Sequence, residues 1–150
     1  MPPLELMHFS ALCREPLHSQ KRLFERAAEE IGGQTGLPGE TIYRELLARE
    51  KLGSTGVGEG VAIPHSRIAG CESPVGCLMT LSEPVDFAAI DGVGVDIVFV
   101  LLVPEAATQQ HLDLLAALAT LFSDAATRER LRNATTAAEL AACLADIGVA

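Results

Sequence analysis

The stretch EKLGSTGVGEGVAIPHSR, from Glu50 to Arg67, has the composition of a tight loop that leads into a strand. Glycines at positions 53, 56, 58 and 60 permit positive φ and let several backbone N–H groups turn toward one point. The apolar run 61–63 follows, and Pro64 then fixes its own φ immediately before His65. An imidazole beside a concave set of neutral donors suits phosphoryl transfer. The same residues also fit a glycine-rich hairpin with a surface histidine.

Neither of two common glycine motifs for nucleotides is present. The phosphate loop G-x-x-x-x-G-K-[ST] needs a lysine after its glycines, but Lys51 precedes them. The dinucleotide motif G-x-G-x-x-G fails because position 61, after Gly56 and Gly58, is valine. The loop therefore does not predict nucleotide binding.

Length and composition predict one globular domain over residues 1–150. The chain is 49% hydrophobic and 21% charged and has no tryptophan, so alanine, leucine and valine must fill its core. The net charge of −9 argues against nucleic acid as a partner. It fits a cytoplasmic protein whose partner presents basic side chains, and it equally fits a charge that only aids solubility.

The cysteines indicate neither a disulfide framework nor a metal site. No C-x-x-C pair occurs, and we expect all of them to be reduced apolar fillers: Cys13, Cys71, Cys77 and Cys143. The first thirteen residues lack the charged start and apolar core of a secretory signal. No apolar run approaches the length that crosses a membrane, so we expect no membrane insertion.

Hydrophobic periodicity predicts alternating helices and strands. Ser19 is positioned to cap a helix over about 20–31, which Gly32-Gly33 would stop, and Pro38 suits the first position of a second helix. The remaining elements are strands near 75–81 and 96–103 and helices near 38–50, 108–123, 125–132 and 137–145. This order predicts an α/β fold of mixed α+β character. We expect a three-layer sandwich with a mixed parallel and antiparallel sheet of about five strands, flanked by helices on both faces.

Two side chains outside the loop are candidates for the same site. Arg49 falls at a helix C-terminus, where the dipole favours cations, so it either complements that dipole or faces a phosphoryl group. His111 falls in the first turn of the helix near Thr108, where the positive dipole end favours a neutral imidazole. It is either a donor to an anion or a locally bonded histidine. We expect His8 and His18 to be surface or cap residues.

The segment REKLGSTGVGEGVAIPH, from Arg49 to His65, resembles the active-site signature of a bacterial family. This family comprises the enzyme IIA domains of the fructose/mannitol type in the phosphoenolpyruvate-dependent phosphotransferase system. G-S-T after R-E-K-L is most similar to the nitrogen-regulatory enzyme IIA. The resemblance extends to residues 86–91, to the strand ending at 101–104 and to His111-Leu112. It spans nearly the whole chain and is least clear in the first fifteen residues.

The resemblance implies a phosphocarrier in which His65 accepts a phosphoryl group from an HPr-like protein and His111 is the second active-site histidine. Arg49 and the donors of Ser54, Thr55 and Gly56 would then stabilise the transferring group, with Ser66 and Arg67 at the rim. No cofactor or metal ion is implied. The tautomer of His65 depends on a hydrogen-bond partner that the sequence does not identify.

Three functions stay open at this point. The nitrogen-regulatory type implies a switch whose phosphorylation controls binding to targets such as sensor kinases or potassium transport proteins. A sugar-transport enzyme IIA would use the same chemistry and pass the group to an enzyme IIB. A phosphate-independent binding module would use its histidines structurally. No fused partner or membrane domain is recognised in the chain, and we therefore favour the regulatory reading.

Overall fold

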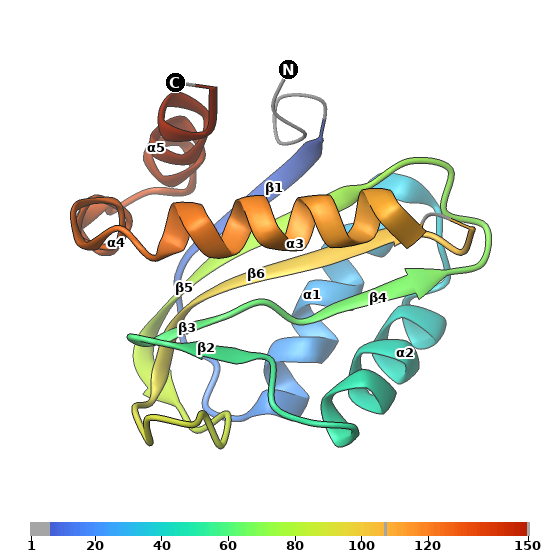
Figure 1. The fold of residues 1–150 in the computed structure, drawn as a ribbon, viewed down its shortest axis with the longest axis horizontal. Helices are drawn as coiled ribbons and strands as arrows, with labels where there is room; N and C mark the ends of the chain where they lie inside the picture. Colours follow the sequence, from blue (N-terminus) through green and yellow to red (C-terminus); the bar gives the residue numbers. More distant parts are fainter. Residues whose placement is uncertain (1–6, 107, 150) are drawn as a thin grey trace.

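The computed structural model describes residues 7–106 and 108–149, which form one mixed sheet with helices on both faces (Figure 1). In chain order the described elements are β1 (His8–Glu15), α1 (Gln20–Thr35), α2 (Gly39–Lys51), β2 (Gly56–Gly58), β3 (Val61–Ala62), β4 (His65–Ile68), β5 (Val75–Val85), β6 (Val95–Pro104), α3 (Thr108–Phe122), α4 (Ala125–Asn133) and α5 (Ala137–Val149).

The described sheet has six strands in the order β1-β5-β6-β3-β2, with β4 also paired to β6. β1 runs parallel to β5, β5 antiparallel to β6, and both β3 and β4 run parallel to β6. The two short strands follow one path along β6 and are interrupted around Pro64, which has no N–H to donate. The mixed sheet is confirmed, with one strand more than the five or so expected.

The core lies on both faces of the sheet, as the three-layer prediction requires. In β6, alternate residues enter opposite cores, because successive side chains of a strand point to opposite faces. Val98, Val100 and Leu102 pack with α1 and α2, whereas Phe99 and Leu101 pack with α3, α4 and α5. Figure 1 shows the two sets of helices on opposite faces. The consecutive apolar residues of β6 therefore reflect burial on both sides.

Helix α1 confirms one sequence prediction and corrects another. The Ser19 hydroxyl accepts a hydrogen bond from the N–H of Arg22 at 3.2 Å, so Ser19 is the cap that was expected. The helix does not stop at Gly32-Gly33 and instead continues to Thr35. A Cβ at Gly32 would lie 3.0 Å from the carbonyl oxygen of Leu37, so this glycine permits a close turn toward α2. The cap is Gly36, with φ of 79°.

The other helices begin and end close to the expected residues. Pro38 is the residue before α2 and not its first helical residue, which is Gly39. Within the described ranges, no helix combines the length and apolar character needed to cross a membrane.

Candidate functional site

His65 is the first residue of β4, and the backbone before and after it is hydrogen-bonded to β6. It pairs with Leu101 of β6, and the N–H of Leu101 donates to the carbonyl of Pro64 at 2.9 Å. The short β3 strand before it pairs with β6 as well. His65 is half-buried, so the ring is anchored by a central strand and still reaches solvent.

One hydrogen bond selects the tautomer of His65. Its Nδ1 lies 2.7 Å from the carbonyl oxygen of Ile63, which can only accept, so Nδ1 carries the proton. The lone pair is then on Nε2. Burial lowers the pKa of His65 below its usual value; the Ile63 hydrogen bond and the Glu50 carboxylate oppose this, and the Arg49 charge adds to it. The ring is therefore neutral and nucleophilic at pH 7.

His111 lies in the first turn of α3, as the sequence predicts, and meets His65 edge to face. The ring centroids are 5.1 Å apart and the ring planes make an angle of 69°. Burial lowers the pKa of His111 most, and a proton on His65 and the charges of Arg67 and Arg49 lower it further. Its Nε2 is buried and makes no hydrogen bond within the described part of the chain. This nitrogen is free to bond a group that enters the site.

A pocket of about 440 Å³ joins the two histidines to the end of α2. Its lining residues are Glu45, Ala48, Arg49, Leu52, His65, Ser66, Arg67 and His111. The three predicted catalytic side chains thus share one cavity, and the two predicted rim residues line it too. A larger pocket of about 560 Å³, near residues 70–75 and the end of α1, contains none of them.

Three lining residues were not predicted, although the sequence carries a signal for them. Glu45 lies four residues before Arg49, and Ala48 lies three residues after Glu45 and four before Leu52, the residue that caps α2, so these spacings place all of them along one face of the helix and its C-terminal end. Once Arg49 faces the site, its neighbours on that helical face must face it as well.

Arg49 lines the pocket and also closes the loop. Its Nη1 donates to the carbonyl of Gly53 at 2.9 Å, across the end of α2. One donor of this guanidinium therefore stabilises the glycine turn. The remaining donors of the side chain can serve the pocket.

The three predicted phosphoryl-binding residues make hydrogen bonds to the protein itself, both within the loop and to the segment between β5 and β6. The hydroxyl and N–H of Thr55, which is only 5% exposed, donate to the Glu50 carboxylate at 2.6 and 3.1 Å. The Ser54 hydroxyl donates to the carbonyl of Phe87 at 2.6 Å and accepts from the N–H of Gly56 at 3.0 Å. None of the three lines the pocket, so their direct contact with a phosphoryl group stays a prediction.

Glu50 is the central residue of this loop, and the sequence reasoning missed it. Gln20 donates to the same carboxylate at 3.3 Å, in addition to Thr55. A signal existed, because a carboxylate near a helix C-terminus is disfavoured by the dipole and needs donors elsewhere. Glu50 therefore fixes the loop from the end of α2.

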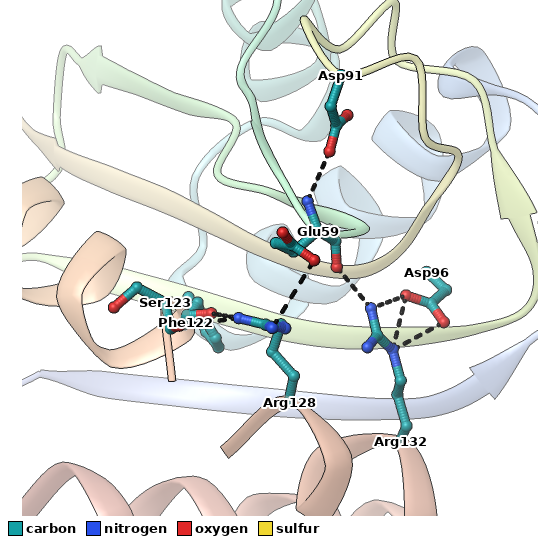
Figure 2. Close-up of polar contacts among 7 residues, drawn as sticks. All are labelled: Glu59, Asp91, Asp96, Phe122, Ser123, Arg128 and Arg132. Carbon is teal, nitrogen blue, oxygen red and sulfur yellow. Dashed lines mark hydrogen bonds and ion pairs between the residues drawn. The ribbon is translucent and has the colours of Figure 1, made fainter. Parts of the chain in front are cut away.

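Two arginines of α4 hold the hairpin that precedes His65 (Figure 2). Arg132 binds the Asp96 carboxylate through Nε and Nη2 at 2.9–3.1 Å and donates to the carbonyl of Glu59 at 2.8 Å. The N–H of Glu59, whose φ is 58°, donates to Asp91 at 2.9 Å. Arg128 donates to the carbonyls at the end of α3 and lies 3.8 Å from the Glu59 carboxylate. The tip of the β2–β3 hairpin is thus bonded both to the segment between β5 and β6, through Asp91, and to α4, through the two arginines.

No group of three or more histidine, cysteine, aspartate or glutamate side chains in the described ranges is arranged to hold a metal ion. His8 and His18 are both exposed, in agreement with the sequence prediction, and His18 lies 3.6 Å from Glu83.

Comparison with known proteins shows that most of the chain matches one family. The model of the family described as "Phosphoenolpyruvate-dependent sugar phosphotransferase system, EIIA 2" matches residues 12–147. The nitrogen regulatory protein of Pseudomonas aeruginosa is 48% identical over 140 residues, which cover 91% of this chain and 90% of that protein.

Two further similarities bear on the function. The crystal structure of nitrogen regulatory protein IIA-Ntr from Neisseria meningitidis superimposes with a TM-score of 0.83 at 44% identity, covering 93% of this chain and 97% of that one. The 2-O-alpha-mannosyl-D-glycerate-specific EIIABC component of Escherichia coli is 41% identical over 112 residues, which cover 73% of this chain but 17% of that protein.

Proposed function

The chain belongs to the EIIA type 2 family of the phosphoenolpyruvate-dependent sugar phosphotransferase system, and we propose that it carries a phosphoryl group on Nε2 of His65. One observation supports this assignment above the others. The hydrogen bond from Nδ1 to the Ile63 carbonyl leaves Nε2 as the nitrogen with a lone pair. The lowered pKa keeps this nitrogen unprotonated at neutral pH.

The donor in this proposal is an HPr-like protein phosphorylated on a histidine. The lone pair of Nε2 attacks phosphorus while the P–N bond of the donor breaks, and the electron pair of that bond returns to the donor imidazole. The Nδ1 proton of His65 stays on the Ile63 hydrogen bond throughout. Charge spreads over the equatorial oxygens in such a step, so fixed donors are the main contribution of the protein.

Arg49 and His111 are the groups that we place around those oxygens. Both line the pocket with His65, and the buried Nε2 of His111 has no partner among the described residues. The hydroxyls and amides of Ser54, Thr55 and Gly56 form the frame of the loop. Their direct donation to phosphate requires that Ser54 and Thr55 exchange their bonds to Phe87 and Glu50, and that the Gly56 N–H exchanges its bond to the Ser54 hydroxyl.

The carrier protein would dock over the mouth of the pocket. Leu52 is 85% exposed on its rim, and Leu112, next to His111, is 60% exposed. Two large apolar side chains beside a reacting histidine suit a transient interface whose centre is apolar. The net charge of −9 fits a partner with basic residues around that centre.

We propose that the protein acts as a regulator and that it does so in the cytoplasm. The nitrogen regulatory relatives match nearly the full length of the chain, both in sequence and in structure. Phosphorylation adds roughly −1.5 to −2 charge by analogy with other phosphorylated side chains. On an acidic protein, this change would alter binding to a target such as a sensor kinase or a potassium transport protein.

A second candidate is a sugar-transport enzyme IIA that passes the group to an enzyme IIB. The similarity to the mannosylglycerate-specific EIIABC component, over 73% of this chain, favours it. The chemistry at His65 is the same in both candidates, and only the acceptor differs.

Phosphoenolpyruvate, enzyme I and an HPr-like carrier should add one acid-labile phosphate to the protein. We expect His65→Ala to abolish labelling and His18→Ala, which removes an exposed histidine outside the pocket, to retain it. A label that survives in His65→Ala would reject the assignment. Affinity for sensor kinases and potassium transport proteins, measured in both phosphorylation states, then tests the output. Equal affinities, together with transfer to an enzyme IIB, would favour sugar transport.

A further inference from the structure

Arg67 lines the pocket and carries a positive charge, but it has no role in the phosphoryl transfer proposed for His65. It is two residues beyond His65 on β4, so the two side chains leave the same face of the strand. Both line the 440 Å³ pocket. Arg67 is exposed, and its guanidinium makes no hydrogen bond or ion pair within the described ranges. Arg49, by contrast, already donates to Gly53.

A phosphoryl group on His65 would add oxygen acceptors to the pocket that Arg67 lines. Guanidinium groups match phosphate oxygens with two parallel hydrogen bonds, and an unpaired one has all its donors available. The charge of Arg67 already reaches the interior of the site, since it contributes to the lowered pKa of His111. Arg67 is therefore placed to bind a phosphoryl dianion at the mouth of the pocket.

We propose that Arg67 binds the oxygens of the phosphoryl group once it is on His65, a role that rests on the proposed function. The P–N bonds that form and break are those already described; Arg67 stays protonated and gives only hydrogen bonds. Because it contacts the phosphorylated form and has no partner in the free form, it stabilises the phosphorylated protein. It thereby sets the equilibrium with the carrier.

The test compares Arg67→Gln and Arg67→Lys with Arg130→Gln. Arg130 is an exposed arginine of α4, 3.4 Å from Asp146, at the opposite end of the molecule from β4 (Figure 1). Its loss changes the net charge equally and breaks only an exposed pair. The equilibrium constant for transfer from the phosphorylated carrier should fall roughly tenfold or more in Arg67→Gln, the loss expected for a hydrogen bond between charged groups. Arg67→Lys should recover part of it, and Arg130→Gln should match the parent protein.

A second readout involves no carrier at all. The phosphorus resonance of the isolated phosphoprotein, followed against pH, should titrate at a higher pH in Arg67→Gln, because a nearby cation favours the dianion. Values equal to those of Arg130→Gln in both experiments would overturn the role of Arg67 and leave the phosphorylation of His65 intact. A parent protein that takes up no phosphate would overturn the proposed function itself.

Discussion

Replacing Thr55 with valine should weaken the whole loop, because one buried hydroxyl holds the Glu50 carboxylate. Valine keeps the shape of the side chain but removes the donor that lies 2.6 Å from Glu50. A hydrogen bond to a charged group contributes about 1.5–3 kcal/mol. The Thr55 N–H and Gln20 still bond the carboxylate, so we expect a loss near the middle, about 2 kcal/mol, or ~4–8 °C in Tm.

A double-mutant cycle isolates this contact from other effects of the substitution. Urea unfolding of Thr55→Val, Glu50→Ala and the double variant gives their coupling free energy, which we expect to be about 1–2 kcal/mol. A coupling below about 0.5 kcal/mol, the usual error of additivity, would refute the reasoning. Transfer to His65 should also slow in Thr55→Val. The carbonyl of Thr55 accepts from the N–H of Ile63 at 3.0 Å, and Ile63 in turn holds the imidazole.

Three further outcomes follow from the same contacts. The pKa of the His65 ring should lie below the usual histidine value of about 6.5. Because the unfolded chain then binds more protons, the contribution of His65 to folding stability is present above a pH of about 6.5 and is lost as the pH falls through the lowered pKa. An NMR titration that gives a pKa at or above about 6.5 would contradict this expectation. Arg132→Gln should cost about 1 kcal/mol, discounted for partial exposure, and speed hydrogen exchange at the Glu59 N–H; unchanged exchange would show that the Asp96 pair does not hold the hairpin. Burial raises the pKa of Cys77 to about 12, so its thiol should resist alkylation until the protein unfolds, and rapid labelling of the folded protein would contradict the structure.

Local chemistry in the sequence predicts much of the fold. Ser19 caps α1 as expected, and the consecutive apolar residues of β6 correspond to burial on both faces. Gly32-Gly33 misled the prediction, since a helix tolerates a glycine at about 1 kcal/mol when packing compensates. Here the missing Cβ permits the approach of Leu37.

The site, like the fold, combines features that the sequence predicts with contacts that depend on tertiary packing. His65, His111 and Arg49 share one pocket, as the resemblance to the enzyme IIA domains implies. The bond from Ser54 to Phe87 joins residues 33 apart, and that from Arg132 to Asp96 joins residues 36 apart. Such pairs depend on tertiary packing and carry no local pattern, so the sequence does not predict the bond from Ser54 to the segment between β5 and β6.

The most direct measurement is the ¹⁵N NMR spectrum of the phosphorylated protein with labelled histidine. Coupling between phosphorus and Nε2 of His65, with Nδ1 still protonated, is the result that the Ile63 hydrogen bond predicts. Phosphorus bonded to Nδ1, or to a nitrogen of His111, would contradict it.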